Sequence, residues 1–155
     1  MDHDEETPEG FEGLELALGL GMLTLAWSKY ELALFALFAS VLGTTPHKAR
    51  VIWFGLVSFD LRLRLLRQLA AEGCKSVSDI EAVVDEAVKL AKRRNRFVHW
   101  QWSEESSRFI LRNYRAPRKP DSQYFVPPNS AKTLARDIRA AYERVSKAAR
   151  NEHDG

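Results

Sequence analysis

Hydrophobic side chains occupy nearly every side of the helix that the pattern predicts from about Phe11 to Leu42, where Gly43 ends it. A helix tolerates apolar residues all round only when several of its surfaces are covered. We therefore expect this first helix either to be central to a bundle or to place one face against another subunit.

The length of this apolar segment would also permit a membrane span. Lys29, Tyr30 and Glu31 interrupt it near the middle, which leaves two apolar pieces that are each too short to cross a bilayer. The acidic start of the chain does not resemble a secretory signal. A single cysteine, Cys74, excludes an internal disulfide and fits a reducing compartment. We expect no membrane span and a cytoplasmic protein.

A second helix is predicted over residues 51–71. Thr45 followed by Pro46 is a favourable helix start, because the hydroxyl can cap a free amide and proline suits the first helical position. We expect a bend near Gly55 and an end at Gly73.

A third helix follows a capping box, in which Ser78 is the expected cap and Glu81 reaches back. Apolar residues then recur at the spacing of a core-facing helix, at Ile80, Val83, Val84, Ala87, Val88 and Ala91. At the same spacing, the next inward positions are Arg94, Asn95 and Val98.

The helical pattern fails between about Ser103 and Asn129. Residues 108–115 alternate apolar and polar side chains, which predicts a strand or a hairpin arm, and four prolines make the following connection stiff. A fourth helix starts near Asn129 or Ser130, with an apolar face made of Leu134, Ile138, Ala141, Tyr142 and Val145. We therefore predict an all-α fold, a four-helix bundle with a small extended insertion before the last helix.

The chain has 155 residues, which suffice for one core and are too few for two ordinary domains. We expect a disordered acidic tail over 1–10, one helical domain over 11–150 and a disordered tail over 151–155.

Charge is unevenly distributed along the chain. The first fifteen residues hold seven acids and no Lys or Arg, whereas residues 89–119 hold ten Lys or Arg and two acids. Such a basic segment indicates a polyanion as the partner of one face. Aromatic rings interleaved with the cations would suit base stacking, although core packing is the commoner fate of an aromatic side chain. The RNA-binding candidates are Arg93, Arg96, Trp100, Trp102, Arg108, Arg112 and Arg115, with Phe109 and Tyr114 among the interleaved rings.

The most specific feature is the polar trio Arg94, Asn95 and His99 at the end of the third helix. Burying such groups costs several kcal/mol unless partners or water satisfy them, so we expect the helix to open here into a cleft, a polar network or a subunit interface. A structural alternative is that the cations complement the carbonyl end of the helix and the histidine caps it.

These residues resemble a known family. The segment from Arg94 to His99 is similar to the Arg-(four to six residues)-His signature of the HEPN superfamily, including the Asn directly after the Arg. The first helix with Trp27 and Glu31, the position of the motif and the closing helix extend the resemblance over most of the chain. It implies a four-helix domain of HEPN type, a homodimer and metal-independent endoribonuclease activity, as in toxin-antitoxin and antiviral defence systems. The chain departs from the family at Trp100, where a small residue is frequent.

The chemistry of RNA cleavage without a metal fits the trio. His99 is the type of side chain that exchanges a proton near neutral pH, Arg94 offers charged donors to the phosphorane, and Asn95 either orients the imidazole or holds a phosphate. One histidine does not easily serve as both acid and base, so a homodimer that brings two motifs together would complete the site. Cleavage would leave a 2′,3′-cyclic phosphate, and an antitoxin or another regulatory protein is a further possible partner.

Other residues have simpler interpretations. Glu31 is a candidate to pair with Arg94, and an ion pair with a neighbouring helix is the alternative. Arg62, Arg64 and Arg67 are read as the solvated side of the second helix. No spacing of Cys and His makes a zinc site, and no glycine-rich phosphate loop is present, so we predict neither a metal nor a cofactor. The alternative function is a non-catalytic helical module that binds RNA or protein.

Overall fold

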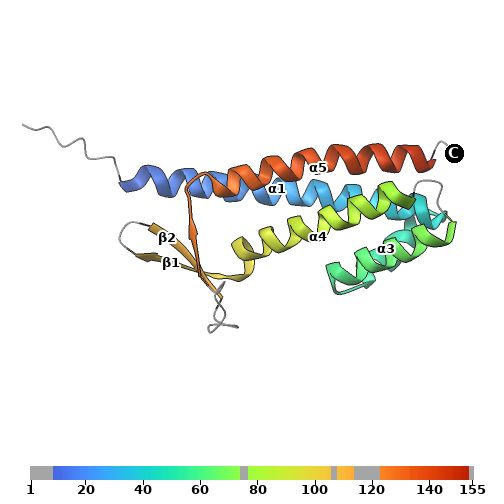
Figure 1. Ribbon diagram of the computed structural model, residues 1–155, viewed down its shortest axis with the longest axis horizontal. Coiled ribbons are helices and arrows are strands. Elements are labelled where there is room, and N and C mark those ends of the chain that lie inside the picture. The colour runs from blue at the N-terminus through green and yellow to red at the C-terminus, as the bar shows by residue number, and fades with distance from the viewer. Residues whose placement is uncertain (1–8, 74–76, 106–107, 114–122, 154–155) are drawn as a thin grey trace, which may run out of the picture.

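Three long helices lie side by side and make up most of the protein. The computed structural model describes residues 9–73, 77–105, 108–113 and 123–153. Helices α1 (Glu9–Leu42) and α5 (Ser130–His153) form the most extensive contact between elements. They run parallel to each other, while α4 (Val77–His99) packs on α5 in the opposite direction (Figure 1).

A glycine permits the closest approach of α1 to α5. A Cβ atom added at Gly19 would meet the backbone nitrogen of Lys132 at 3.1 Å and the Cβ of Ala131 at 3.3 Å. By contrast, a Cβ at Gly21 would meet nothing within 4 Å. The first turn of α5 therefore rests on α1 at a position where a side chain would have to displace its neighbours.

The core lies where α1, α4 and α5 meet. The apolar face predicted for the last helix is confirmed, since Leu134, Ile138, Ala141 and Val145 are buried and Tyr142 is partly buried. The largest completely buried side chains include Tyr30, Phe38, Trp53, Leu66, Ile80 and Leu111, from five different elements. Each buried apolar side chain contributes about 1.5 to 3 kcal/mol, so this shared core fixes the relative positions of the elements.

One face of α1 is not covered by the other residues that the structure describes. Over Gly13–Leu42 this helix is long and apolar enough, by length and composition alone, to cross a membrane, a test that the core helix of a soluble protein also passes. Its buried face packs against α5, α3 and α2. The exposed face carries four leucines, Leu14, Leu18, Leu25 and Leu32, each about 60% exposed or more.

The predicted second helix is two helices in the structure. Helix α2 (Pro46–Gly55) has Thr45 as its N-cap, whose side chain accepts a hydrogen bond from Lys48 N at 3.5 Å, as expected. The bend predicted near Gly55 is instead a break, because Leu56 takes an extended conformation (φ −77°, ψ 116°). Helix α3 (Phe59–Gly73) then starts in a new direction and ends at the predicted glycine.

A small antiparallel sheet precedes the last helix. Strands β1 (Gln101–Glu105), β2 (Arg108–Arg112) and β3 (Gln123–Val126) are ordered β1-β2-β3. The predicted strand coincides with β2, whereas β1 and β3 were not predicted. The register pairs Leu111 with Trp102 on one side and with Tyr124 on the other. A Cβ added at Gly13 would lie 3.9 Å from the Phe109 ring, which places the sheet beside the start of α1.

The fold is therefore mainly helical with a small sheet, and the prediction of a helical protein is confirmed at this level. Most of the predicted acidic tail lies outside the described residues, but Glu9 and Gly10 already belong to α1. The last helix continues to His153, into the segment expected to be a disordered tail. Helix α4 includes Val77, so it begins before the expected cap Ser78, whose side chain lies outside the description.

Candidate functional site

The last two turns of α4 position the predicted site. Val83, Leu90 and Phe97 repeat every seventh residue and are buried, so they define the face of α4 that meets the core. Arg94 is half-buried, as predicted for an inward position. The same prediction is wrong for Asn95, which is exposed, and for Val98, which is 50% exposed. Phe97 continues the seven-residue spacing of Val83 and Leu90 and is buried in place of Val98.

Arg94, Asn95 and His99 line one open pocket, which we call the Arg94 pocket. It has a volume of about 340 Å³. Trp27 and Glu31 of α1, and the corner between α2 and α3, supply the opposite walls. The remaining lining residues are Val57, Ser58, Phe59, Asp60, Arg62 and Ala91. The structure thus brings the predicted catalytic trio together at the surface, and His99 is exposed.

The guanidinium of Arg94 lies against an aromatic ring. Its Cζ is 5.3 Å from the centre of the Trp27 ring, within the range of a cation–π contact. Its Nη1 donates a long hydrogen bond of 3.4 Å to Asn95 Oδ1. Burial lowers the pKa of Arg94, and the nearby charge of Glu31 opposes that shift. Since an arginine stays protonated at any physiological pH, Arg94 is a permanently charged group that is only partly solvated.

Glu31 forms its ion pair with α3. Its Oε1 lies 2.5 Å from Arg62 Nη1, and the two side chains are 27% and 14% exposed. Arg62 also donates from Nε to the carbonyl of Leu56 at 3.0 Å, an acceptor that the break after α2 leaves without a helical partner. Of the two pairings considered for Glu31, the neighbouring helix is therefore the one observed. Among the described residues, Arg94 has no salt bridge.

Arg62 is the site residue that sequence reasoning missed. It was grouped with Arg64 and Arg67 on a solvated face, and those two are indeed exposed, with Arg67 paired to Asp85. Arg62 instead lines the Arg94 pocket and stacks over Trp53 and Phe54, at 5.8 and 5.5 Å. The signal in the sequence was the glycine before Leu56: a break there starts a new helix and turns its first arginine toward α1.

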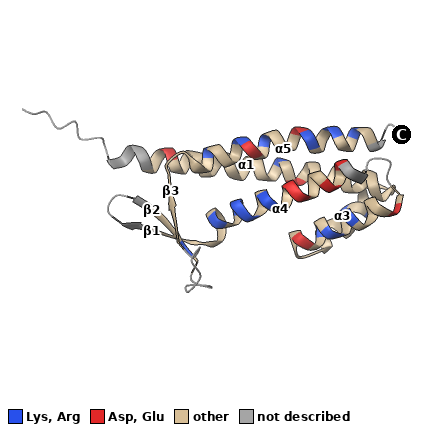
Figure 2. Cartoon of the chain, viewed as in Figure 1, with Lys and Arg blue, Asp and Glu red and all other residues tan. Residues whose placement is uncertain are grey.

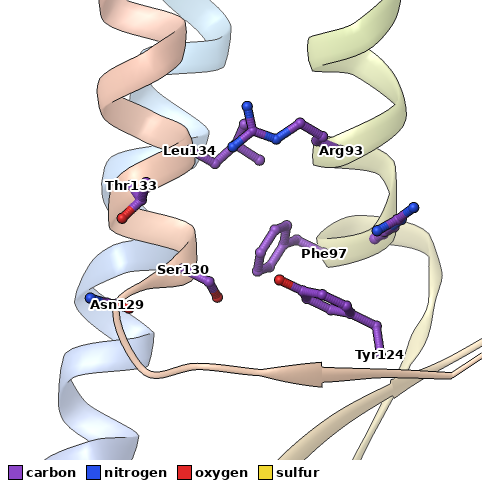
Figure 3. Close-up of a pocket in the computed structure, with 8 residues that line it drawn as sticks. Arg93, Phe97, Tyr124, Asn129, Ser130, Thr133 and Leu134 are labelled. Carbon is purple, nitrogen blue, oxygen red and sulfur yellow. The ribbon is translucent and has the colours of Figure 1, made fainter.

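Two other basic residues of α4 face a second pocket, which we call the Arg96 pocket. Arg93 and Arg96 line it from α4, and Tyr124 of β3 closes it from below in the view of Figure 3. The first turn of α5 forms the opposite wall. The other lining residues are Phe97, Asn129, Ser130, Thr133 and Leu134. The basic segment predicted as one patch is thus divided by α4 between two pockets. Figure 2 shows these basic residues on the half of α4 that leads to the sheet, with its acids on the other half.

The predicted stacking residues are partly used for packing. Trp102 Nε1 donates to the carbonyl of Phe97 at 3.2 Å, and its ring packs on Phe97 and Phe109, with ring centres 6.2 and 6.4 Å apart. For Trp102 and Phe109 the core-packing alternative therefore describes the structure. Trp100 is half-buried and lies under Arg96, 5.7 Å from its Cζ.

The remaining RNA-binding candidates lie on or beyond the sheet. Arg112 is half-buried at the end of β2, opposite Gln101 and Gln123. Arg108 begins β2, but its side chain lies outside the description, as do Tyr114 and Arg115. The sheet thus extends the basic end of α4 without adding a described cation to either pocket.

Within the described ranges, no group of three or more His, Cys, Asp or Glu side chains is placed to hold a metal ion. The side chains that line the Arg94 pocket supply an imidazole, two guanidiniums, a carboxamide, a hydroxyl and two carboxylates. Comparison of the chain with protein-family models, with curated proteins and with solved structures gives no match.

Proposed function

We propose that this protein is a metal-independent endoribonuclease of HEPN type, with Arg94, Asn95 and His99 as its catalytic residues. The observation that carries the proposal is that these three side chains line one solvent-open pocket, with a second guanidinium, Arg62, in its wall. The combination of two guanidiniums and an exposed imidazole in one pocket fits the attack of an RNA 2′-hydroxyl on its own phosphodiester.

The reaction forms the 2′-oxygen–phosphorus bond and breaks the bond from phosphorus to the 5′-oxygen. A base takes the proton of the 2′-hydroxyl, and an acid gives a proton to the departing 5′-oxygen. Arg94 stabilises the charge of the phosphorane, and its contact with Trp27 holds the guanidinium in position. Asn95 accepts a hydrogen bond from Arg94, which orients the Asn95 carboxamide in the same pocket wall as His99.

A second copy of the chain would supply the second imidazole. One histidine, His99, is among the described residues that line the Arg94 pocket, and it suffices for the acid or for the base. Exposed apolar side chains line the pocket or neighbour its lining residues in contact or in sequence, as an interface between copies would require. They are Phe54, Val57, Leu61 and Val98, exposed by 45%, 97%, 43% and 50%. A two-fold axis through this rim would bring two His99 side chains to one groove.

The alternative is a helical module that binds RNA or protein without cleaving it. The single histidine favours this alternative for an isolated chain, since one imidazole cannot start the reaction as base and finish it as acid in the same step. Cleavage therefore separates the two proposals.

The test is cleavage of single-stranded RNA in EDTA by the wild type, by Arg94→Ala and by His99→Ala. Each variant should lose about a hundredfold or more in rate, the usual range for a general acid–base or a charge-stabilising group. His47→Ala and Arg64→Ala, which replace exposed residues outside the pocket, are the matched controls. The products should end in 2′,3′-cyclic phosphates. Equal rates for all variants, or loss of the activity in EDTA, would contradict the mechanism.

The same proposal makes the protein a toxin or phage-defence effector of the cytoplasm, restrained by an antitoxin or another regulatory protein. Expression without that partner should then arrest growth, and His99→Ala should remove the effect. Toxicity that persists in this variant would contradict the assignment.

A further inference from the structure

We propose that the Arg96 pocket is a phosphate subsite, which holds an internal phosphodiester of the RNA strand while another is presented to the Arg94 pocket. This inference rests on the proposed function and adds to it a second place of contact on the strand. The two pockets take different residues from the same end of α4: Arg94, Asn95 and His99 line the first, and Arg93, Arg96 and Phe97 line the second.

The cavity has the size and lining of a small anion site. Its volume of about 290 Å³ is at the lower end for ligand pockets, enough for a phosphate with part of a nucleotide. No Asp or Glu is among its lining residues. In Figure 3 the side chain of Arg93 extends from α4 toward α5, and the Phe97 and Tyr124 rings point into the space between the two helices.

Arg96 is a cation held in place by aromatic rings. Its Cζ lies 5.7 Å from the centre of the Trp100 ring and 5.6 Å from that of Tyr124. Within the described part of the chain it forms no salt bridge. A guanidinium that is fixed by flat walls, with its charge unneutralised, is suited to a bidentate contact with phosphate oxygens.

Arg93 adds a second guanidinium from the same wall. Its Nη1 lies 2.7 Å from Asp137 Oδ2 on α5, and both side chains are nearly half exposed. This pair holds Arg93 across the gap between the helices. A guanidinium has five N–H donors, so the contact with one carboxylate oxygen leaves donors for a ligand.

The uncharged polar side chains of the Arg96 pocket also favour a ligand that accepts hydrogen bonds. Ser130 Oγ donates its proton to the carbonyl of Pro127 at 2.7 Å, so it has no second proton for a ligand. The hydroxyls of Tyr124 and Thr133 and the amide of Asn129 are the remaining polar side-chain groups among the lining residues. A phosphodiester accepts such hydrogen bonds without bringing a proton of its own.

The test measures RNA binding separately from cleavage, in a His99→Ala background. A fluorescein-labelled single-stranded RNA of twelve nucleotides with a 5′-hydroxyl is titrated at several salt concentrations. Arg96→Gln should weaken binding by roughly tenfold and lower the slope of log K against log salt by about 0.7, the value for one phosphate contact on a single strand. Arg150→Gln, at the far end of α5, is the matched control and should change neither quantity.

Two further variants distinguish the subsite from a structural role. Asp137→Asn removes the carboxylate that competes for Arg93, so it should strengthen RNA binding; a structural clamp between α4 and α5 would instead give weaker binding and lower stability. Tyr124→Phe removes one donor and keeps the ring, so it should weaken binding by about threefold without a change of thermal midpoint. An Arg96→Gln protein that folds and binds RNA like its parent overturns the subsite.

The source of the phosphate is tested with three probes. Equal binding of 5′-hydroxyl and 5′-phosphorylated RNA supports an internal phosphodiester. A requirement for the 5′-phosphate, or displacement of the RNA by inorganic phosphate or adenosine monophosphate at millimolar concentration or below, overturns it in favour of a terminal or free phosphate. If the wild type cleaves no RNA but Arg96→Gln still weakens binding, the nuclease proposal fails and the subsite stands.

Discussion

Arg62 Nη1 lies 2.5 Å from Glu31 Oε1, so this carboxylate in the wall of the Arg94 pocket is paired with an arginine of α3 and not with Arg94. Glu31 still influences Arg94, since its charge opposes the lowering of the Arg94 pKa by burial. The ion pair between α1 and α3 therefore keeps an acid beside the site without neutralising the guanidinium that we propose for catalysis.

Replacement of Arg62 tests whether its ion pair with Glu31 keeps Arg94 available to the substrate. Arg62→Gln leaves Glu31 free to pair with Arg94, and we expect RNA cleavage to fall by roughly tenfold, equivalent to about 1.4 kcal/mol of transition-state stabilisation. Glu31→Gln should retain most of the activity, and the double variant should recover it. Rate constants for the four proteins form a double-mutant cycle. If the double variant is as slow as Arg62→Gln, then Arg62 acts directly on the substrate.

Charge placed on the apolar rim should disrupt the proposed homodimer. The side chain of Val57 is 97% exposed at the break between α2 and α3 and lines the Arg94 pocket. We expect Val57→Asp to shift the protein from dimer to monomer in sedimentation and to reduce cleavage in proportion. Leu18→Asp, on the exposed leucine face of α1, is the comparison. Dissociation by Leu18→Asp alone would place the interface on α1 and contradict a site shared at the rim.

Tyr30 should make the protein sensitive to alkali. Its hydroxyl is buried, has no hydrogen-bond partner within the described residues, and has a pKa raised by burial and then by Glu86, against the opposing charge of Arg144. Above pH 10, the ordinary pKa of tyrosine, Tyr30 ionises in the unfolded state but not in the folded state. The free energy of unfolding is therefore unaffected by this group below pH 10 and falls as the pH rises above it.

The matched change is Tyr30→Phe, which removes the hydroxyl and keeps the ring. We expect it to raise the free energy of unfolding by about 1 kcal/mol at pH 7, because it removes a buried unpaired hydroxyl. Its urea midpoint should also fall less than that of the wild type between pH 9 and pH 11. An equal fall in both proteins would show that another group titrates.

Two glycines of α1 should respond in opposite ways to the same substitution. Gly21→Ala should stabilise the protein by about 0.5 to 1 kcal/mol, since alanine is the better helix former and its Cβ meets nothing within 4 Å. Gly19→Ala gains the same propensity but presses on the first turn of α5 at 3.1 Å, so it should be destabilising relative to Gly21→Ala. Thermal midpoints measured side by side test the close packing of α1 on α5. Equal shifts in the two variants would contradict it.

The candidate site was predictable to the extent that it lies on one helix. Arg94, Asn95 and His99 fall within two turns, so the helical period alone places them near one another, and the structure puts them in one pocket. The same period could not say that Arg93 and Arg96 belong to a different pocket. That division depends on where α5 and β3 pack, which is set by contacts between residues distant in sequence.

The missing parts of the fold have a similar cause. The break at Leu56 lies in a segment with no proline, and its stability comes from the Arg62 side chain that caps the free carbonyl. Strand β1 follows α4 directly, and its residues gain a strand partner only when β2 folds back on it. Local patterns identified the three long helices, and merged only α2 with α3, because a helix satisfies its own backbone, whereas a strand does not.

The parallel pairing of α1 with α5 has a consequence for synthesis on the ribosome. The surface of α1 that α5 covers, including the close contact at Gly19, is shielded from water and from chaperones only after the last helix has been synthesised. Helices α2, α3 and α4 emerge from the ribosome earlier but do not cover that surface of α1. A nascent chain that stalls before Ser130 would therefore expose the hydrophobic surface of α1. Quality-control proteases should recognise this intermediate far more readily than the complete protein.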